Sequence, residues 1–224
     1  MAIATDATAK STGSAATSKT WSHTCAGSDR ILIVHGWNNS VNGATTFTGC
    51  TYNGVAMTSL GSSYFLAVGG YTEVFYLAGP ATGTHDIVLS QSASQYVAGI
   101  SASYTGVKQT SPLSGTVTQN TTVTTNEATT VATTDDNSWV VAAVAENGGG
   151  AQTAGANTVA RLVDVALMNG GIYDSNSAVT PAGNYTLNFN GTGVGRTWVD
   201  IAFAMAPAGA AVVATKNLTL LGAG

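Results

Sequence analysis

Charged side chains are scarce in this sequence of 224 residues. They make up 8% of it, with 7 Lys and Arg against 11 Asp and Glu, whereas globular proteins average about 25%. Binding a nucleic-acid backbone requires clustered cations, and the cations here are scattered singly along the chain. We therefore expect no nucleic acid as a partner, and the same scarcity predicts no binding to an anionic membrane surface.

The sequence also lacks a recognisable secretion signal and any long hydrophobic run. Met1 is followed by Ala-Ile-Ala-Thr-Asp, without the basic and apolar regions of a signal peptide. No apolar stretch approaches the roughly 18 residues of a membrane span. A composition so low in charge is unusual for a cytosolic protein, because charge supports solubility. A virion protein, made in the host cytoplasm and released by lysis, fits these observations, so we expect a virion location.

Cysteine is nearly absent, since Cys25 and Cys50 are the only two. Their spacing matches no zinc pattern, and either buried free thiols or a disulfide formed after release would fit them. Oxygen ligands for Ca²⁺ could come from Asp135-Asp136-Asn137 or from Asp174-Ser175-Asn176. The same residue types build turns by bonding their own backbone, and a turn is the interpretation we favour. We therefore expect no metal and no cofactor.

Catalytic motifs are missing as well. The segment Leu32–Trp37 contains a His-Gly pair similar to that near the oxyanion hole of α/β hydrolases, but that fold requires a nucleophile elbow of the form G-x-S-x-G. The nearest segment, Gly99–Ser103, does not have this form. Glu73, Glu127 and Glu146 are far apart in the sequence and indicate no carboxylate pair of the kind that glycosidases use. We expect that the protein is not an enzyme.

What the sequence does contain is a series of short apolar or alternating segments divided by turn residues. Asn53-Gly54 is a strong hairpin signal, and no segment keeps a helical period beyond two turns. Short strands at this spacing indicate a sandwich or a barrel, and we favour an all-β, jelly-roll-like antiparallel sandwich. The predicted strands are 20–25, 30–37, 46–52, 55–59, 72–77, 85–90, 96–104, 116–134, 138–145, 158–168, 184–190 and 196–206.

Two of these strands are expected to carry the core. Their alternating apolar residues are Trp139, Val141, Val144, Trp198, Ile201 and Phe203. The three histidines are expected to be packed in strands or at sheet edges. Trp37, next to a predicted loop, is the one tryptophan that we expect to be exposed.

Both ends of the chain read differently from the middle. Residues 1–19 are small and polar, and they are expected to form an arm or a strand recruited by another molecule. Residues 20–208 are expected to be the sandwich, and residues 209–224 a C-terminal arm. This last segment is apolar and β-prone, so it either mediates assembly or folds back as an edge strand. The assembly residues predicted in it are Val212, Val213, Leu218, Leu220 and Leu221.

Several runs of this sequence form a recognisable set: Thr20–Thr24, Gly27–Val34, Thr51–Thr58, Glu73–Leu77, Gly83–Val88 and Ser103–Gln109. Between about residues 18 and 206, the chain resembles through these runs a β-sandwich family encoded widely in bacteriophage genomes. The resemblance implies a role on the virion surface and no catalytic residues.

The function expected from the sequence is therefore that of a structural protein on the outside of a virion, a capsid decoration protein or a fibre subunit. Its expected partners are copies of itself and other virion proteins. Two alternatives stay open: a tail module that binds a receptor or host-surface glycan, and an extracellular filament subunit.

Overall fold

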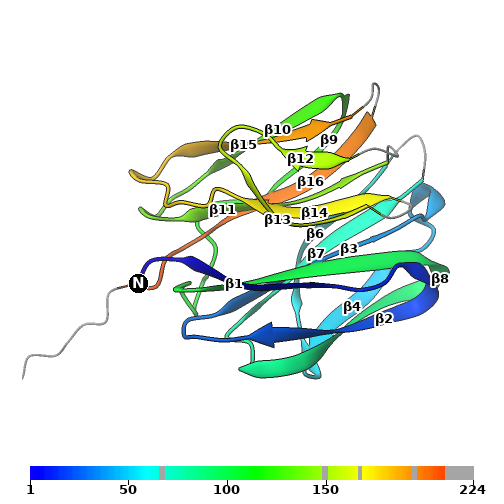
Figure 1. Cartoon of the computed structure of the whole chain (residues 1–224), viewed down its shortest axis with the longest axis horizontal. Helices are drawn as coiled ribbons and strands as arrows, with labels where there is room; N and C mark the ends of the chain where they lie inside the picture. The colour runs from blue at the N-terminus through cyan, green and yellow to red at the C-terminus, as the bar shows by residue number, and fades with distance from the viewer. Residues whose placement is uncertain (66–68, 148–150, 166–167, 193–195, 210–224) are drawn as a thin grey trace, which may run out of the picture.

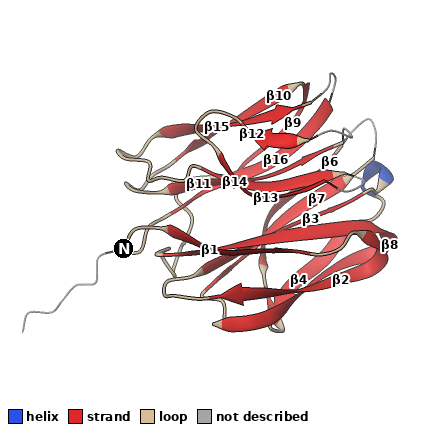
Figure 2. Cartoon of the chain, viewed as in Figure 1, coloured by secondary structure: helices blue, strands red, loops and turns tan. Residues whose placement is uncertain are grey.

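The computed structural model describes residues 1–65, 69–147, 151–165, 168–192 and 196–209. These residues form antiparallel strands and one three-residue 3-10 helix, Val41–Gly43, and they contain no α-helix (Figure 2). The prediction of an all-β, sandwich-like fold is confirmed. Its jelly-roll form is not confirmed by the strand order.

The first half of the chain forms one 8-stranded sheet that folds over on itself. The 23-residue strand β8 makes this possible, because its early part, up to Gln91, pairs with β2 and β4, whereas its later part, from Val97, pairs with β3. The strands are β1 (Ala4–Lys10), β2 (Ser14–Cys25), β3 (Ile31–Asn38), β4 (Phe47–Tyr52), β5 (Val55–Ala56), β6 (Thr58–Tyr64), β7 (Tyr71–Ala78) and β8 (Gly83–Thr105).

The second half forms a 5-stranded and a 3-stranded sheet, in the orders β13-β14-β11-β16-β9 and β10-β15-β12. Its strands are β9 (Thr118–Thr124), β10 (Asn126–Ala132), β11 (Trp139–Glu146), β12 (Gln152–Ala154), β13 (Val159–Val165), β14 (Asn169–Asp174), β15 (Asn184–Gly191) and β16 (Arg196–Met205).

The two halves repeat the same topology. The inner sheet of the first half runs β6-β7-β3-β8-β1, the counterpart of β13-β14-β11-β16-β9, and its outer layer β2-β8-β4 is the counterpart of β10-β15-β12. The registers agree as well. The paired ends of the central ladders are Ile31 with Tyr104 and Asn38 with Val97 in the first half, and Trp139 with Met205 and Glu146 with Trp198 in the second. The chain is therefore a duplicated sandwich, which the sequence did not lead us to predict.

The halves stack into four layers, with the two inner sheets face to face (Figure 1). At one side β1 lies beside β13, where Lys10 Nζ is 2.7 Å from Asp164 Oδ1. At the other side β6 lies beside β9, where the hydroxyls of Ser63 and Thr121 are 3.2 Å apart. Since β9 is the counterpart of β1 and β13 that of β6, the halves are arranged as a two-fold axis would place them.

Three apolar cores hold the layers together. The central core lies between the halves and includes alternate residues of β3 and β11, among them Ile33 and Val141. The other faces of these strands, with Val34 and Val140, pack onto the outer layers of their own halves. Both strands are buried over their whole length, which explains why they read as continuous apolar runs rather than alternating ones.

The six predicted core residues are all buried, but they do not share one face. Trp139, Val141, Ile201 and Phe203 belong to the central core, whereas Val144 and Trp198 belong to the core of the second half.

The expectation for Trp37 was wrong. This residue is fully buried in the central core because the second half of the chain covers it.

The N-terminal segment also differs from the expectation of an arm. Residues 4–10 and 14–19 pair with β8 of their own chain, and the boundary predicted at residue 19 falls inside β2. Their sequence hides this role because small Thr, Ser and Ala residues bury little apolar surface. Residues 210–224 lie outside the described residues.

The contact between Trp37 and Gly170 provides a test of the seam, by which we mean the interface between the two halves. A Cβ atom added at Gly170 would overlap the Trp37 indole. The indole is fully buried, so it has no free space into which it could shift. We expect Gly170→Ala to lower the free energy of unfolding by about 1–3 kcal/mol, the usual cost of overpacking. Gly183→Ala is the matched control, because nothing lies within 4 Å of its added Cβ. Denaturant unfolding checks both variants, and equal stabilities would contradict this packing.

Candidate functional site

The two ends of the described chain meet at one end of the seam between the halves. The amino group of Met1 donates to the carbonyl oxygen of Ala208 at 2.6 Å. The backbone N–H of Ala208 in turn donates to the carbonyl of Gly106, and Val107 forms an antiparallel bridge with Pro207. The segments that follow the last strand of each half thus pair with each other.

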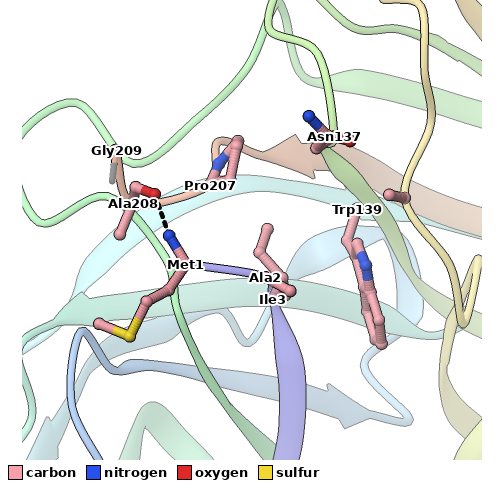
Figure 3. Close-up of a pocket in the computed structure, with 9 residues that line it drawn as sticks. Met1, Ala2, Ile3, Asn137, Trp139, Pro207, Ala208 and Gly209 are labelled. Carbon is pink, nitrogen blue, oxygen red and sulfur yellow. Dashed lines mark hydrogen bonds between the residues drawn. The ribbon is translucent and has the colours of Figure 1, made fainter. Parts of the chain in front are cut away.

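Beside this junction lies a cavity of about 400 Å³, which we call the terminal pocket (Figure 3). Ile3 and Trp139 are its most buried members and belong to the central core. The lining residues are Met1, Ala2, Ile3, Asn137, Trp139, Ala178, Pro207, Ala208 and Gly209. Nearly all these side chains are apolar and none is a nucleophile or a carboxylate, so the pocket suits an apolar segment rather than chemistry on a substrate.

A polar network stands next to the terminal pocket and ties the halves together. Arg161 contacts both carboxylate oxygens of Asp174, at 2.6 and 2.7 Å, and its guanidinium lies 5.8 Å from the centre of the Trp139 ring. Tyr104, from the first half, donates to Asp174 across the seam at 3.0 Å. Burial, and secondarily the charge of Asp174, raises the pKa of Tyr104 well above its ordinary value. This network positions β13 and β14 against β8.

His23 belongs to a second buried network, which fixes β1. Its ring nitrogens lie 2.9 Å from Ser101 Oγ and 3.0 Å from Ser103 Oγ, and Ser103 donates to Asp6 at 2.8 Å. A catalytic triad would need the carboxylate on the histidine; here it is on the serine. Burial lowers the pKa of His23 to about 4, so the ring is neutral near pH 7.

Asp200 has the most unusual surroundings among the carboxylates of the described residues. Its side chain has no exposed surface and accepts hydrogen bonds at Oδ2 from Thr129 (2.5 Å) and Asn120 (3.3 Å). Its Oδ1 is buried and has no hydrogen-bond partner among the described residues. Burial, and then the neighbouring charge of Glu127, raises the pKa of Asp200 to about 7.

The buried charges are distributed unevenly. Every Asp, Glu, Lys or Arg that is buried among the described residues lies in the second half: Glu127, Glu146, Asp164, Asp174, Arg196 and Asp200. The position in β8 that is equivalent to Asp200 in β16 is Gly99. The Trp21 indole packs on this glycine. An apolar contact in one half is thus a polar network in the other.

The cysteines, the other two histidines and Glu73 were also considered from the sequence, and each of them lies in or beside a β-strand. Cys25 and Cys50 are buried and unbonded, which decides between the two alternatives for them. His35 is buried and contacts the Thr72 hydroxyl at 2.7 Å, whereas His85 lies in β8 near the surface. Glu73 accepts hydrogen bonds from Ser59 and Tyr71.

The two acidic loops act as turns. The backbone N–H of Asn176 donates to Asp174 Oδ1 at 2.8 Å, and Asn137 has a positive φ of 63°. Among the described residues, no three His, Cys, Asp or Glu side chains come together as a possible metal site. The predicted assembly residues Val212, Val213, Leu218, Leu220 and Leu221 lie outside the described residues.

Comparisons with protein-family models, with curated proteins and with solved structures give no match to this chain. No helix in the described part of the chain is long and apolar enough to cross a membrane.

Sequence reasoning missed the terminal pocket, because its walls come from the first and last described residues and from the β11 and β14 regions. One signal could have revealed it. Asp29 and Asn137 each precede a long apolar strand, and this repeated turn-strand pattern marks the duplication that brings the ends together.

The raised pKa of Asp200 predicts a measurable pH dependence of stability. A carboxyl whose folded-state pKa lies above its ordinary value of 3.8 stabilises the fold below that value, and this stability is lost as the pH rises through about 7. Asp200→Asn removes the titration. We expect the free energy of unfolding of this variant, relative to the wild type, to increase by about 2–4 kcal/mol between pH 4 and pH 8.

Comparing variant with wild type cancels the contributions of His23 and His35, whose lowered pKa values act in the opposite direction. Chemical denaturation at both pH values makes the measurement. A difference that stays constant with pH would show that Asp200 is ionised throughout.

Proposed function

We propose that the protein is a structural subunit on the exterior of a bacteriophage virion, a capsid decoration protein or a fibre subunit. The observation that carries the proposal is the chemistry of the two outermost layers. The outward residues of β10 are Asn126, Ala128, Thr130 and Ala132, and those at the end of β2 are Ser18, Thr20, Ser22 and Thr24.

These faces are unusually poor in charge and in long side chains. Thr130 and Thr186 hydroxyls lie 2.8 Å apart on one face, and Thr24 and Thr84 hydroxyls 2.7 Å apart on the other. Short side chains lose little rotamer entropy when a partner covers them, whereas Lys, Arg and Glu lose up to about 2 kcal/mol each. A molecule with two such faces at opposite ends of its stack is suited to packing against other subunits.

The duplicated architecture supports the same proposal. Two sandwiches that share a central core form one thick block. The resemblance of the sequence to phage-encoded sandwiches supports a place on the virion surface. The low charge of the whole chain fits a protein that works in contact with other proteins.

A second candidate function, binding of a host-surface glycan, is favoured by one groove. It has a volume of about 410 Å³ and lies on the outer layer of the first half, lined by Thr51, Asn53, Gly54, Thr84, His85, Asp86 and Val88. Its lining includes hydroxyl, amide, imidazole and carboxylate groups, which can form hydrogen bonds with sugar hydroxyls. Binding of oligosaccharides that Asp86→Ala abolishes would favour this function over a purely structural one.

Deletion of residues 210–224 tests the structural role. All the core residues that the structure describes precede this segment, so we expect the truncated protein to keep its fold. We expect its copy number on purified particles to fall at least tenfold when truncated and full-length proteins compete for incorporation, as measured by quantitative mass spectrometry. Absence of the full-length protein from particles would overturn the proposed function itself.

A further inference from the structure

We propose that the terminal pocket is a socket for the C-terminal segment of a second copy of this chain, with Val212 and Val213 as the inserted side chains. The inference deepens the proposed assembly role and takes its biological meaning from it. Its physical basis is independent, because the equivalent place in the first half of the chain is filled by a side chain of that half.

In the first half the place equivalent to the terminal pocket is closed. Val107 follows β8 as Ala208 follows β16, and Asp29 precedes β3 as Asn137 precedes β11. Asp29 and Asn137 even share the left-handed backbone conformation, with φ of 50° and 63°. The Val107 N–H donates to the Asp29 carbonyl at 2.8 Å, and the Val107 side chain is fully buried in the central core.

In the second half this closure is absent. Ala208 donates its N–H to Gly106 instead of to Asn137. Its methyl group is also smaller than the Val107 side chain, and both Ala208 and Asn137 line the terminal pocket. The missing elements are therefore a β-branched side chain and a short length of extended backbone beside Asn137 and Trp139.

The C-terminal segment contains both elements. Beyond Gly209, which lines the pocket, come Ala-Ala-Val212-Val213-Ala, and Lys216 is the only charged residue up to Gly224. Valine favours extended backbone, and burying one such side chain contributes about 1.5–3 kcal/mol. The sequence thus supplies the same side chain that fills the equivalent place in the first half.

The geometry favours the segment of a second copy over that of the same chain. To enter its own pocket, Val212 would have to return by a tight turn at Gly209 itself, because Ala210 and Ala211 are not turn-forming residues. The segment starts at the rim of the pocket, so two copies placed around a two-fold axis can insert their segments into each other reciprocally. Such an isologous exchange closes as a dimer and doubles the buried area.

Mixed cross-linking of the full-length protein tests the insertion. One population carries Ala178→Cys, at an exposed position on the pocket, and the other carries Val213→Cys. Both populations have Cys25 and Cys50 replaced by Ala. We expect an intermolecular disulfide when the two are mixed under oxidising conditions, and a loss of at least tenfold in its yield with Leu221→Cys in place of Val213→Cys.

The oligomeric state provides the second measurement. We expect a dimer by sedimentation. The double substitution Val212→Asp with Val213→Asp should raise its dissociation constant at least tenfold, and Thr219→Asp in the same segment should raise it far less. Two results would overturn the proposal. One is a monomeric protein in which a chain carrying both Ala178→Cys and Val213→Cys forms an internal disulfide. The other is a dimer whose dissociation constant is unchanged by substitution of both valines. Because these measurements use purified protein, they can fail while the protein is still found on particles, and they can succeed when it is not.

Discussion

The packing of the two inner sheets against each other is the constraint on which the rest of the structure depends. Each inner sheet must bury one face on its own outer layer and the other on the opposite half. Strands β3 and β11 therefore have no face exposed to solvent. A charged or polar group inside the stack needs a partner, as in Arg161 with Asp174, or Arg196 with Glu146 of β11 at 2.5 Å. The apolar composition of β3 and β11 follows from this arrangement in four layers.

The duplication also explains how much could be predicted from the sequence. The fold class and most strand positions followed from local patterns, since apolar runs and Asn-Gly turns are signals carried by neighbouring residues. Strands β12 and β14 were not predicted, and β9 and β10 were predicted as one strand. The burial of Trp37 did not, because the loop after it suggested solvent, whereas Gly170 from the other half provides the surface that covers it. Strand β1 was hidden for a similar reason: its small residues become a strand only when β8 is present to pair with them.

The two halves differ in sequence, although the registers of their central strands agree. Gly99 leaves room for the Trp21 indole, whereas Asp200 in the equivalent position bonds to the smaller Thr129. One contact is apolar and the other polar, so the equivalence is visible in the pairing of strands and not in residue identity. The terminal pocket arises in the same way, where Ala208 replaces the counterpart of Val107. The candidate site is thus a local departure from an internal symmetry, and only the structure could reveal it.

The central claim, that a shared core makes the two halves one unit, can be measured directly by native-state hydrogen exchange in increasing denaturant. The amides of β3 and β11 lie in the same core although they come from different halves. We predict that both strands exchange only through the same global opening, with equal free energies and equal dependence on denaturant. Exchange of one half by an opening that leaves the other half protected would contradict the account.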